Sequence, residues 1–307
     1  MKLITTSVVR GSRQGESHGG VYLIDLEARS ATQAVDWNKA DIDWQGRGWD
    51  RGLRGIAFDG ETVYIAASDE LFAYTPDFRR IGSWRNRYLK HCHEIAVWQR
   101  TLFLTSTGFD SILGFDLDAQ RFFWALHVSE SEHRFRGRRY DPCSESGPML
   151  LNKLHVNSVH CNEHGMYIGG RRTGGLLHFN GKAIRMAVEL PAGCHNARPF
   201  RDGVLFNDSE ADALRYAGRG EGEEDRAFRV PAYPPERLTH AGEDTSGLAR
   251  QGFARGLAVL SDSVVAGGSS PSTVTVYDLP GNRPLLSVNL TLDIRNAIHG
   301  LEVWPYD

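Results

Sequence analysis

The chain has 307 residues, of which 41% are hydrophobic and 24% are charged, and its formal net charge is −3 at pH 7. These proportions are ordinary for a globular protein, and the small net charge gives no reason to expect a nucleic-acid or membrane partner. The sequence has no apolar run of the roughly 18 residues that a membrane-spanning helix needs, and its N-terminus lacks the apolar segment of a secretory signal. We therefore expect a cytoplasmic protein.

From Arg54 onward the chain repeats a pattern of short apolar runs separated by turn residues. After His93, for example, the runs are Ile95 to Trp98, Leu102 to Ser106 and Ile112 to Asp116. Runs of this length without helical spacing are typical of antiparallel strands. Each repeat begins with a histidine or an arginine, and the six leading residues are Arg54, His93, His155, His195, Arg255 and His299.

The spacing of these leading residues predicts a β-propeller. Successive leading residues are about 40 or about 60 residues apart, and a propeller blade of four strands needs roughly 40 to 50 residues. The sixth repeat is cut short at the C-terminus, and the N-terminal runs 2–8 and 20–26 supply the strands that it lacks. We therefore predict an all-β fold with one domain over residues 1–307. It is a six-bladed β-propeller whose last blade is closed by the C-terminal strand plus N-terminal strands, which leaves no long exposed sheet edge.

Three segments are expected to form long loops on one face, near residues 30–50, 127–150 and 217–250. The first carries Trp37, Trp44 and Trp49, which would anchor it in a small satellite core or stack on a sugar or ring. The innermost strand of a propeller blade begins at one mouth of the central channel, where the loop before it also ends. We therefore expect the leading residues and the long loops to surround the same mouth, an arrangement typical of a binding or catalytic site.

Histidine occupies four of the six leading positions, at His93, His155, His195 and His299. Neutral imidazoles that converge on one axis suit a divalent metal ion, because each supplies one nitrogen and together they leave positions open for water or substrate. We predict that these residues bind zinc, iron or manganese, and the sequence does not choose among the three. Two alternatives remain open, namely a polar channel that holds water and direct binding of an anion by the histidines and arginines.

The two leading arginines, Arg54 and Arg255, would be costly to bury without an anion. That anion is either a neighbouring side chain, with Asp69, Asp110, Asp208 and Glu210 as the candidates, or a carboxylate or phosphate of the substrate held by a bidentate fork. The predicted catalytic residues are Arg54, Arg255, Asp208 and Asp110. The predicted substrate-binding residues lie on loops at the same mouth and are Arg171, Arg172 and His18.

The N-terminal segment Ile4 to Leu26 and the strand Leu154-His-Val-Asn-Ser-Val resemble an uncharacterised bacterial β-propeller family. This resemblance implies the fold and no activity. In architecture, the ring of histidines is similar to the propeller of the peptide-amidating lyase, which has a zinc site of three histidines and a nearby arginine. The use of four histidines resembles the carotenoid-type oxygenases, whose propellers have seven blades and bind iron. Both similarities are analogies of fold.

These features together predict a metal-dependent enzyme of the lyase or hydrolase type that acts on a small organic anion. The bound ion would polarise a substrate oxygen or activate water, an arginine would orient the substrate, and an aspartate would transfer the proton. One alternative is a non-haem iron oxygenase with four histidine ligands. Another is a non-enzymatic propeller that binds a ligand or a protein.

Overall fold

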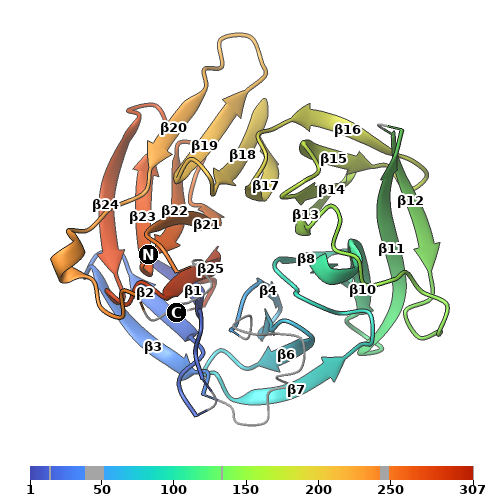
Figure 1. Cartoon of the computed structure of the whole chain (residues 1–307), viewed down its shortest axis with the longest axis horizontal. Helices are drawn as coiled ribbons and strands as arrows, with labels where there is room; N and C mark the ends of the chain where they lie inside the picture. The colour runs from blue at the N-terminus through green and yellow to red at the C-terminus, as the bar shows by residue number, and fades with distance from the viewer. Residues whose placement is uncertain (14, 39–51, 133, 243–248, 307) are drawn as a thin grey trace. The chain divides into compact units, whose positions relative to one another are not determined.

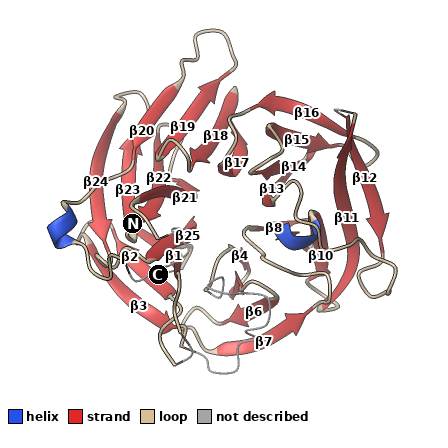
Figure 2. Ribbon diagram, viewed as in Figure 1, coloured by secondary structure: helices blue, strands red, loops and turns tan. Residues whose placement is uncertain are grey.

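The computed structural model describes residues 1–13, 15–38, 52–132, 134–242 and 249–306. Strands dominate this part of the chain, and its only helices are two single 3-10 turns, η1 (Thr107–Phe109) and η2 (Pro235–Arg237) (Figure 2). Neither of these turns is long and apolar enough to cross a membrane. The chain divides into two compact units, which we describe separately: the central unit, residues 56–206, and the terminal unit, residues 1–55 with 207–307.

The strands form six antiparallel sheets (Figure 1). The first contains β4 (Ile56–Asp59), β5 (Thr62–Ala66), β6 (Glu70–Tyr74) and β7 (Arg80–Arg85). The second contains β8 (Ile95–Trp98), β9 (Thr101–Ser106), β10 (Ser111–Asp116), β11 (Arg121–Ser131) and β12 (Arg134–Tyr140). The third contains β13 (Val156–Asn162), β14 (Gly165–Gly170), β15 (Gly175–Phe179) and β16 (Ile184–Glu189).

The remaining sheets follow the same up-and-down order. The fourth contains β17 (Cys194–Phe200), β18 (Gly203–Asp208), β19 (Ala213–Gly218) and β20 (Arg226–Arg229). The fifth contains β21 (Gly252–Val259), β22 (Val264–Ser270), β23 (Thr273–Asp278) and β24 (Arg283–Asn289). The sixth has the order β25 (Asn296–Val303), β1 (Lys2–Val9), β2 (Gly20–Asp25) and β3 (Ser30–Asp36).

The sixth sheet confirms the predicted closure of the last blade. The C-terminal strand β25 pairs antiparallel with β1, with Leu3 opposite Val303 and Thr5 opposite Leu301 (Figure 1). The Thr5 hydroxyl also donates to the carbonyl of Gly300 at 2.7 Å. Six sheets of four or five strands, one of them shared between the two ends of the chain, make the fold class a six-bladed β-propeller, as predicted.

Burial of apolar side chains explains why these short runs form sheets. In the central unit, Leu71, Leu104 and Leu113 are fully buried in a cluster that joins the first and second sheets. Leu126 and Ile168 belong to a second cluster, which joins the second and third sheets. The outermost strands carry little of this core, since most side chains of β3, β7, β12 and β16 are exposed or half-buried.

Each of the three segments expected to form long loops contains an outer strand. Residues 30–36 form β3, and Trp37 after it is buried, whereas Trp44 and Trp49 lie outside the described residues. Residues 134–140 form β12, all of whose residues pair with β11. The segment 217–250 contains β20 and the turn η2. The expectation of a single domain stays a prediction.

Candidate functional site

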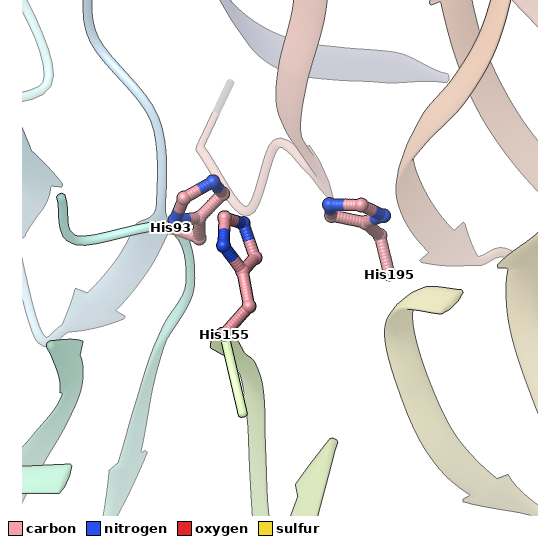
Figure 3. Close-up of side chains that lie close together, drawn as sticks. All are labelled: His93, His155 and His195. Carbon is pink, nitrogen blue, oxygen red and sulfur yellow. The ribbon is translucent and has the colours of Figure 1, made fainter. Parts of the chain in front are cut away.

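Three of the predicted metal ligands come together in the central unit. His93 precedes β8, His155 precedes β13, and His195 is the second residue of β17. The ring centroids of His93 and His155 are 5.3 Å apart. The ring centroid of His195 lies 6.1 Å from that of His93 and 6.3 Å from that of His155. One nitrogen from each ring lies within 4.8 Å of the others, and Figure 3 shows the three imidazoles gathered together. We call this group the histidine triad.

Backbone carbonyls fix the protonation of two of the three rings. The Nδ1 of His93 lies 2.7 Å from the carbonyl oxygen of His91, and the Nδ1 of His195 lies 2.9 Å from that of Gly193. A carbonyl oxygen can only accept a hydrogen bond, so each Nδ1 carries the proton and donates it. In each neutral ring the lone pair is then on Nε2, and this tautomer is one in which histidine binds metals.

The third ring is held by a side chain. The Nδ1 of His155 lies 3.1 Å from Oδ1 of Asn152 and donates to it in the same tautomer. Arg172 in turn braces the loop that carries Asn152, since its guanidinium donates to the backbone carbonyls of Asn152 and, at 2.6 Å, of Lys153. In the structure, Arg172 thus acts on the position of His155, and its predicted contact with substrate stays a prediction.

Arg171 links the positions of two histidines through its backbone. Its N–H donates to the carbonyl of His155 at 3.1 Å, and its carbonyl accepts from the N–H of Gly193 at 2.9 Å. Gly193 is the residue whose own carbonyl holds Nδ1 of His195. The side chain of Arg171 is exposed beside these contacts, which is compatible with the predicted role in substrate binding but does not test it.

Thr107 and Asp110 lie in the turn between β9 and β10 and hold the start of β13 and the loop before it. The buried hydroxyl of Thr107 donates to the carbonyl of Val156 at 2.5 Å and lies 2.9 Å from Nδ1 of His93. The carboxylate of Asp110 accepts from the backbone N–H groups of Lys153, at 2.5 Å, and Leu154, at 3.1 Å. These contacts make Asp110 a brace of the loop before His155, and its predicted catalytic role stays a prediction.

The sequence reasoning missed a second polar group, at the residues that follow the leading histidines. Glu94 accepts from the backbone N–H of Val159 at 3.1 Å and from the amide of Asn196 at 3.3 Å. Burial raises the pKa of Glu94, and the positive charge of Arg198 opposes part of this shift. Burial, with a smaller effect of Arg198, lowers the pKa of His160 to about 4. Glu94 and Asn196 have a signal in the sequence, because each is a polar residue directly after a leading histidine, Glu94 after His93 and Asn196 after His195.

The other predicted residues at leading positions belong to the terminal unit. Nη1 of Arg255 lies 3.3 Å from Nε2 of His299, and since a guanidinium can only donate, this Nε2 accepts. The guanidinium of Arg255 also lies over the ring of Phe253, with its carbon 5.5 Å from the centroid. Arg54 is buried, and its carbonyl accepts from the hydroxyl of Thr6. His299 as a fourth ligand, and both arginines as catalytic residues, stay predictions.

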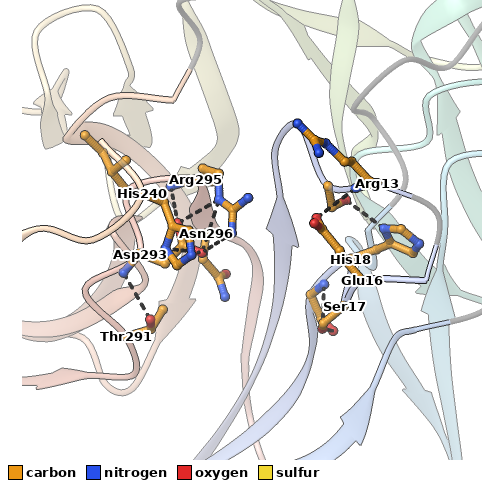
Figure 4. Close-up of polar contacts among 12 residues, drawn as sticks. Arg13, Glu16, Ser17, His18, His240, Thr291, Asp293, Arg295 and Asn296 are labelled. Carbon is orange, nitrogen blue, oxygen red and sulfur yellow. Dashed lines mark hydrogen bonds and ion pairs between the residues drawn. The ribbon is translucent and has the colours of Figure 1, made fainter. Parts of the chain in front are cut away.

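Two further predicted residues in the terminal unit have well-defined partners. His18, labelled in Figure 4, is fully buried. Its Nδ1 lies 2.6 Å from the hydroxyl of Ser12. The carboxylate of Asp208 is buried and accepts from the guanidinium of Arg215 at 3.1 Å. Asp208 also accepts from the backbone N–H of Ala211. These contacts hold local loops in place, and they leave the predicted roles in substrate binding and proton transfer untested.

Comparison with known proteins finds a similarity of fold and no family. No protein-family model matches the chain, and no curated protein matches it. Over 98% of both chains, it is similar to a chain in the crystal structure of a nidogen/laminin complex, with 11% sequence identity and a TM-score of 0.57.

Two propellers with lower TM-scores carry no argument of their own. The structure of the RRP9 WD40 repeats has 11% identity and a TM-score of 0.48, over 79% of this chain and 65% of that one. The Cps50 (Swd1) β-propeller domain of Myceliophteria thermophila has 10% identity and a TM-score of 0.48, over 78% and 86% of the two chains. At such identities the likeness shows the fold alone, and it supports neither a specific family nor the similarity to the peptide-amidating lyase.

Proposed function

We propose that the histidine triad binds one divalent metal ion and that the protein is a metal-dependent enzyme. The observation that carries this proposal is the shared tautomer of His93, His155 and His195. Each Nδ1 is engaged as a donor by a carbonyl or amide oxygen, and one ring nitrogen of each histidine lies within 4.8 Å of the others. Such hydrogen bonds to the far nitrogen are the usual support of histidine ligands in metalloproteins.

The spacing of the triad fits a tetrahedral ion after a small closure. Zinc–nitrogen bonds of roughly 2.0 to 2.1 Å place tetrahedral ligands about 3.3 Å apart. The nitrogens of the triad lie within 4.8 Å of one another, so the rings need to approach by at most about 1.5 Å, which rotation about side-chain bonds can supply. Three histidines would leave at least one position for water or substrate, as in catalytic zinc sites.

The proposed chemistry is of the lyase or hydrolase type, because a three-histidine ion with an open position can activate water or polarise a substrate oxygen. The proposed substrate is a small organic anion. The exposed guanidinium of Arg171, whose backbone N–H donates to the carbonyl of His155, favours negative charge at this place. Two other functions remain as alternatives: an iron-dependent oxygenase, and a propeller that binds a ligand or protein without catalysis.

Metal analysis of the purified protein tests the proposal. We expect about one equivalent of metal per chain in protein purified without added metal, with zinc or manganese favouring lyase or hydrolase action and iron favouring the oxygenase. The single variants His93→Ala, His155→Ala and His195→Ala should lose the metal. His164→Ala, which removes an exposed histidine of the central unit, should retain it. A wild-type protein that stays metal-free after incubation with zinc, manganese and iron would refute the proposal and favour a binding module.

A further inference from the structure

Three consecutive apolar side chains are exposed just before the loop of His155. Met149, Leu150 and Leu151 have relative exposures of 73%, 57% and 51%. Single exposed apolar residues are common on proteins, but adjacent ones rimmed by polar residues mark sites that bind something. Polar residues lie on both sides of this segment, Ser144 to Ser146 before it and Asn152 with Lys153 after it. We call residues 149–151 the apolar rim.

Hydrogen bonds on both sides hold the backbone of the apolar rim in place. Before it, the N–H of Gly147 donates to the hydroxyl of Tyr88 at 2.7 Å. After it, the N–H of Asn152 donates to the carbonyl of Gly108 at 3.0 Å. Because the backbone is anchored, the apolar side chains are presented to the outside by the fold, at a cost that the binding of an apolar group would offset.

The apolar rim borders the histidine triad. Leu151 is followed directly by Asn152, whose Oδ1 accepts from Nδ1 of His155. A Cβ placed on Gly108 would lie 2.7 Å from Cδ1 of Leu150 and 3.4 Å from Cδ2 of His91. The carbonyl of His91 in turn holds Nδ1 of His93. The rim thus continues directly into Asn152, which holds His155, and Leu150 lies on the same side of Gly108 as the side chain of His91.

We propose that the apolar rim receives the hydrocarbon part of the substrate, while the polar or anionic head reaches the ion of the histidine triad. This inference rests on the proposed function and names its substrate class, namely organic anions or acyl compounds with an alkyl or similar apolar chain. A small molecule is the occupant that fits. Three side chains expose far less than the roughly 1,200 to 2,000 Å² that a stable protein interface buries in total, and they adjoin a metal site.

The chain-length dependence of ligand binding tests the inference. The probes are linear alkyl hydroxamates with two to eight carbons, since the hydroxamate head chelates zinc and stands in for the anionic head of the substrate. Titration calorimetry of the zinc-loaded protein should show affinity rising by up to about fourfold per added methylene, the equivalent of roughly 0.8 kcal/mol for full burial. The rise should be strongly reduced in the double variant Met149→Ser and Leu151→Ser. Ile81→Ser, which changes an apolar residue of similar exposure on β7, should keep it.

The outcomes separate this inference from the proposed function. A wild-type protein that binds zinc but shows equal affinity for short and long hydroxamates, or binds neither, overturns the inference and leaves the metal site standing. A chain-length dependence that persists in the double variant also overturns it. The zinc content of that variant shows whether its site is intact, and Leu151→Ser alone provides a second, milder variant. A wild-type protein that takes up no zinc, manganese or iron overturns the metal site and the inference together.

Discussion

The hydrogen bond between Asn152 and His155 allows a sharp test of how the proposed metal site is held. Replacing Asn152 by glycine removes the acceptor, and glycine tolerates the positive φ of 47° that this position adopts. The bond is 3.1 Å long, neutral and half-buried, so its loss is worth about 1 kcal/mol. Loss of this orienting contact weakens metal binding by roughly 10- to 100-fold in comparable sites. We expect the lower end here, about tenfold, because Arg172 still holds the backbone carbonyl of residue 152.

Competition of the protein with a chromophoric chelator for zinc measures this loss directly. Asn152→Asp is the informative partner variant, since a carboxylate accepts the same hydrogen bond more strongly, and its affinity should equal or exceed that of the wild type. Asn282→Gly is the matched control, because Asn282 also has a positive φ of 49° but lies exposed after β23, in the terminal unit. A zinc affinity of Asn152→Gly within twofold of the wild type would refute the role assigned to this bond.

Three other predictions concern stability and reactivity. Ile298→Ala should lower the free energy of unfolding by about 2 to 5 kcal/mol, because Ile298 is fully buried in β25. The control Leu285→Ala, at an exposed position, should change it by about 0.5 kcal/mol or less. A loss below about 1 kcal/mol for Ile298→Ala in urea unfolding would contradict this packing. The pKa of His160 is lowered to about 4, so the unfolded chain binds more protons between about pH 4 and 6.5 and stability falls as the pH falls through that window. His160→Gln should remove about 1 to 2 kcal/mol of the difference in unfolding free energy between pH 7.5 and pH 5, and equal pH dependence of both proteins would speak against it. Burial raises the pKa of the Cys161 thiol to about 12. Since the thiolate is the nucleophile, iodoacetamide at pH 8 should modify the exposed Cys143 before Cys161. Equal labelling of the two cysteines in peptide mass spectra would show this to be wrong.

The strands that could be predicted from the sequence are those with an apolar signature. The apolar runs at residues 2–8 and 20–26 and the truncated repeat at His299 were enough to predict the closing blade, because the last repeat lacked strands that these N-terminal runs could supply. The run from Arg134 to Tyr140 gave no such signal. Four of its seven residues are arginine, and its place in the sheet comes from backbone pairing with β11, which residue type hardly encodes.

The same limit applies to the site. The convergence of His93, His155 and His195 follows from their equivalent positions in three successive repeats, which the sequence displays. Their supports do not follow, because most are backbone groups, such as the carbonyls of His91 and Gly193. The identity of a residue says nothing about where its carbonyl points, so only the folded backbone could reveal which nitrogen of each ring carries the proton.

These supports also connect the histidines to one another. Thr107 joins His93 to the carbonyl of Val156, next to His155, and the backbone of Arg171 joins His155 to Gly193, which holds the third ring. The spacing of the triad is therefore set by hydrogen bonds between blades that exist without an ion. In small zinc domains the metal itself supplies the folding energy. Here the sheets and their apolar clusters supply it, so the fold itself holds the three imidazoles together, which is the preorganisation that the proposed site needs.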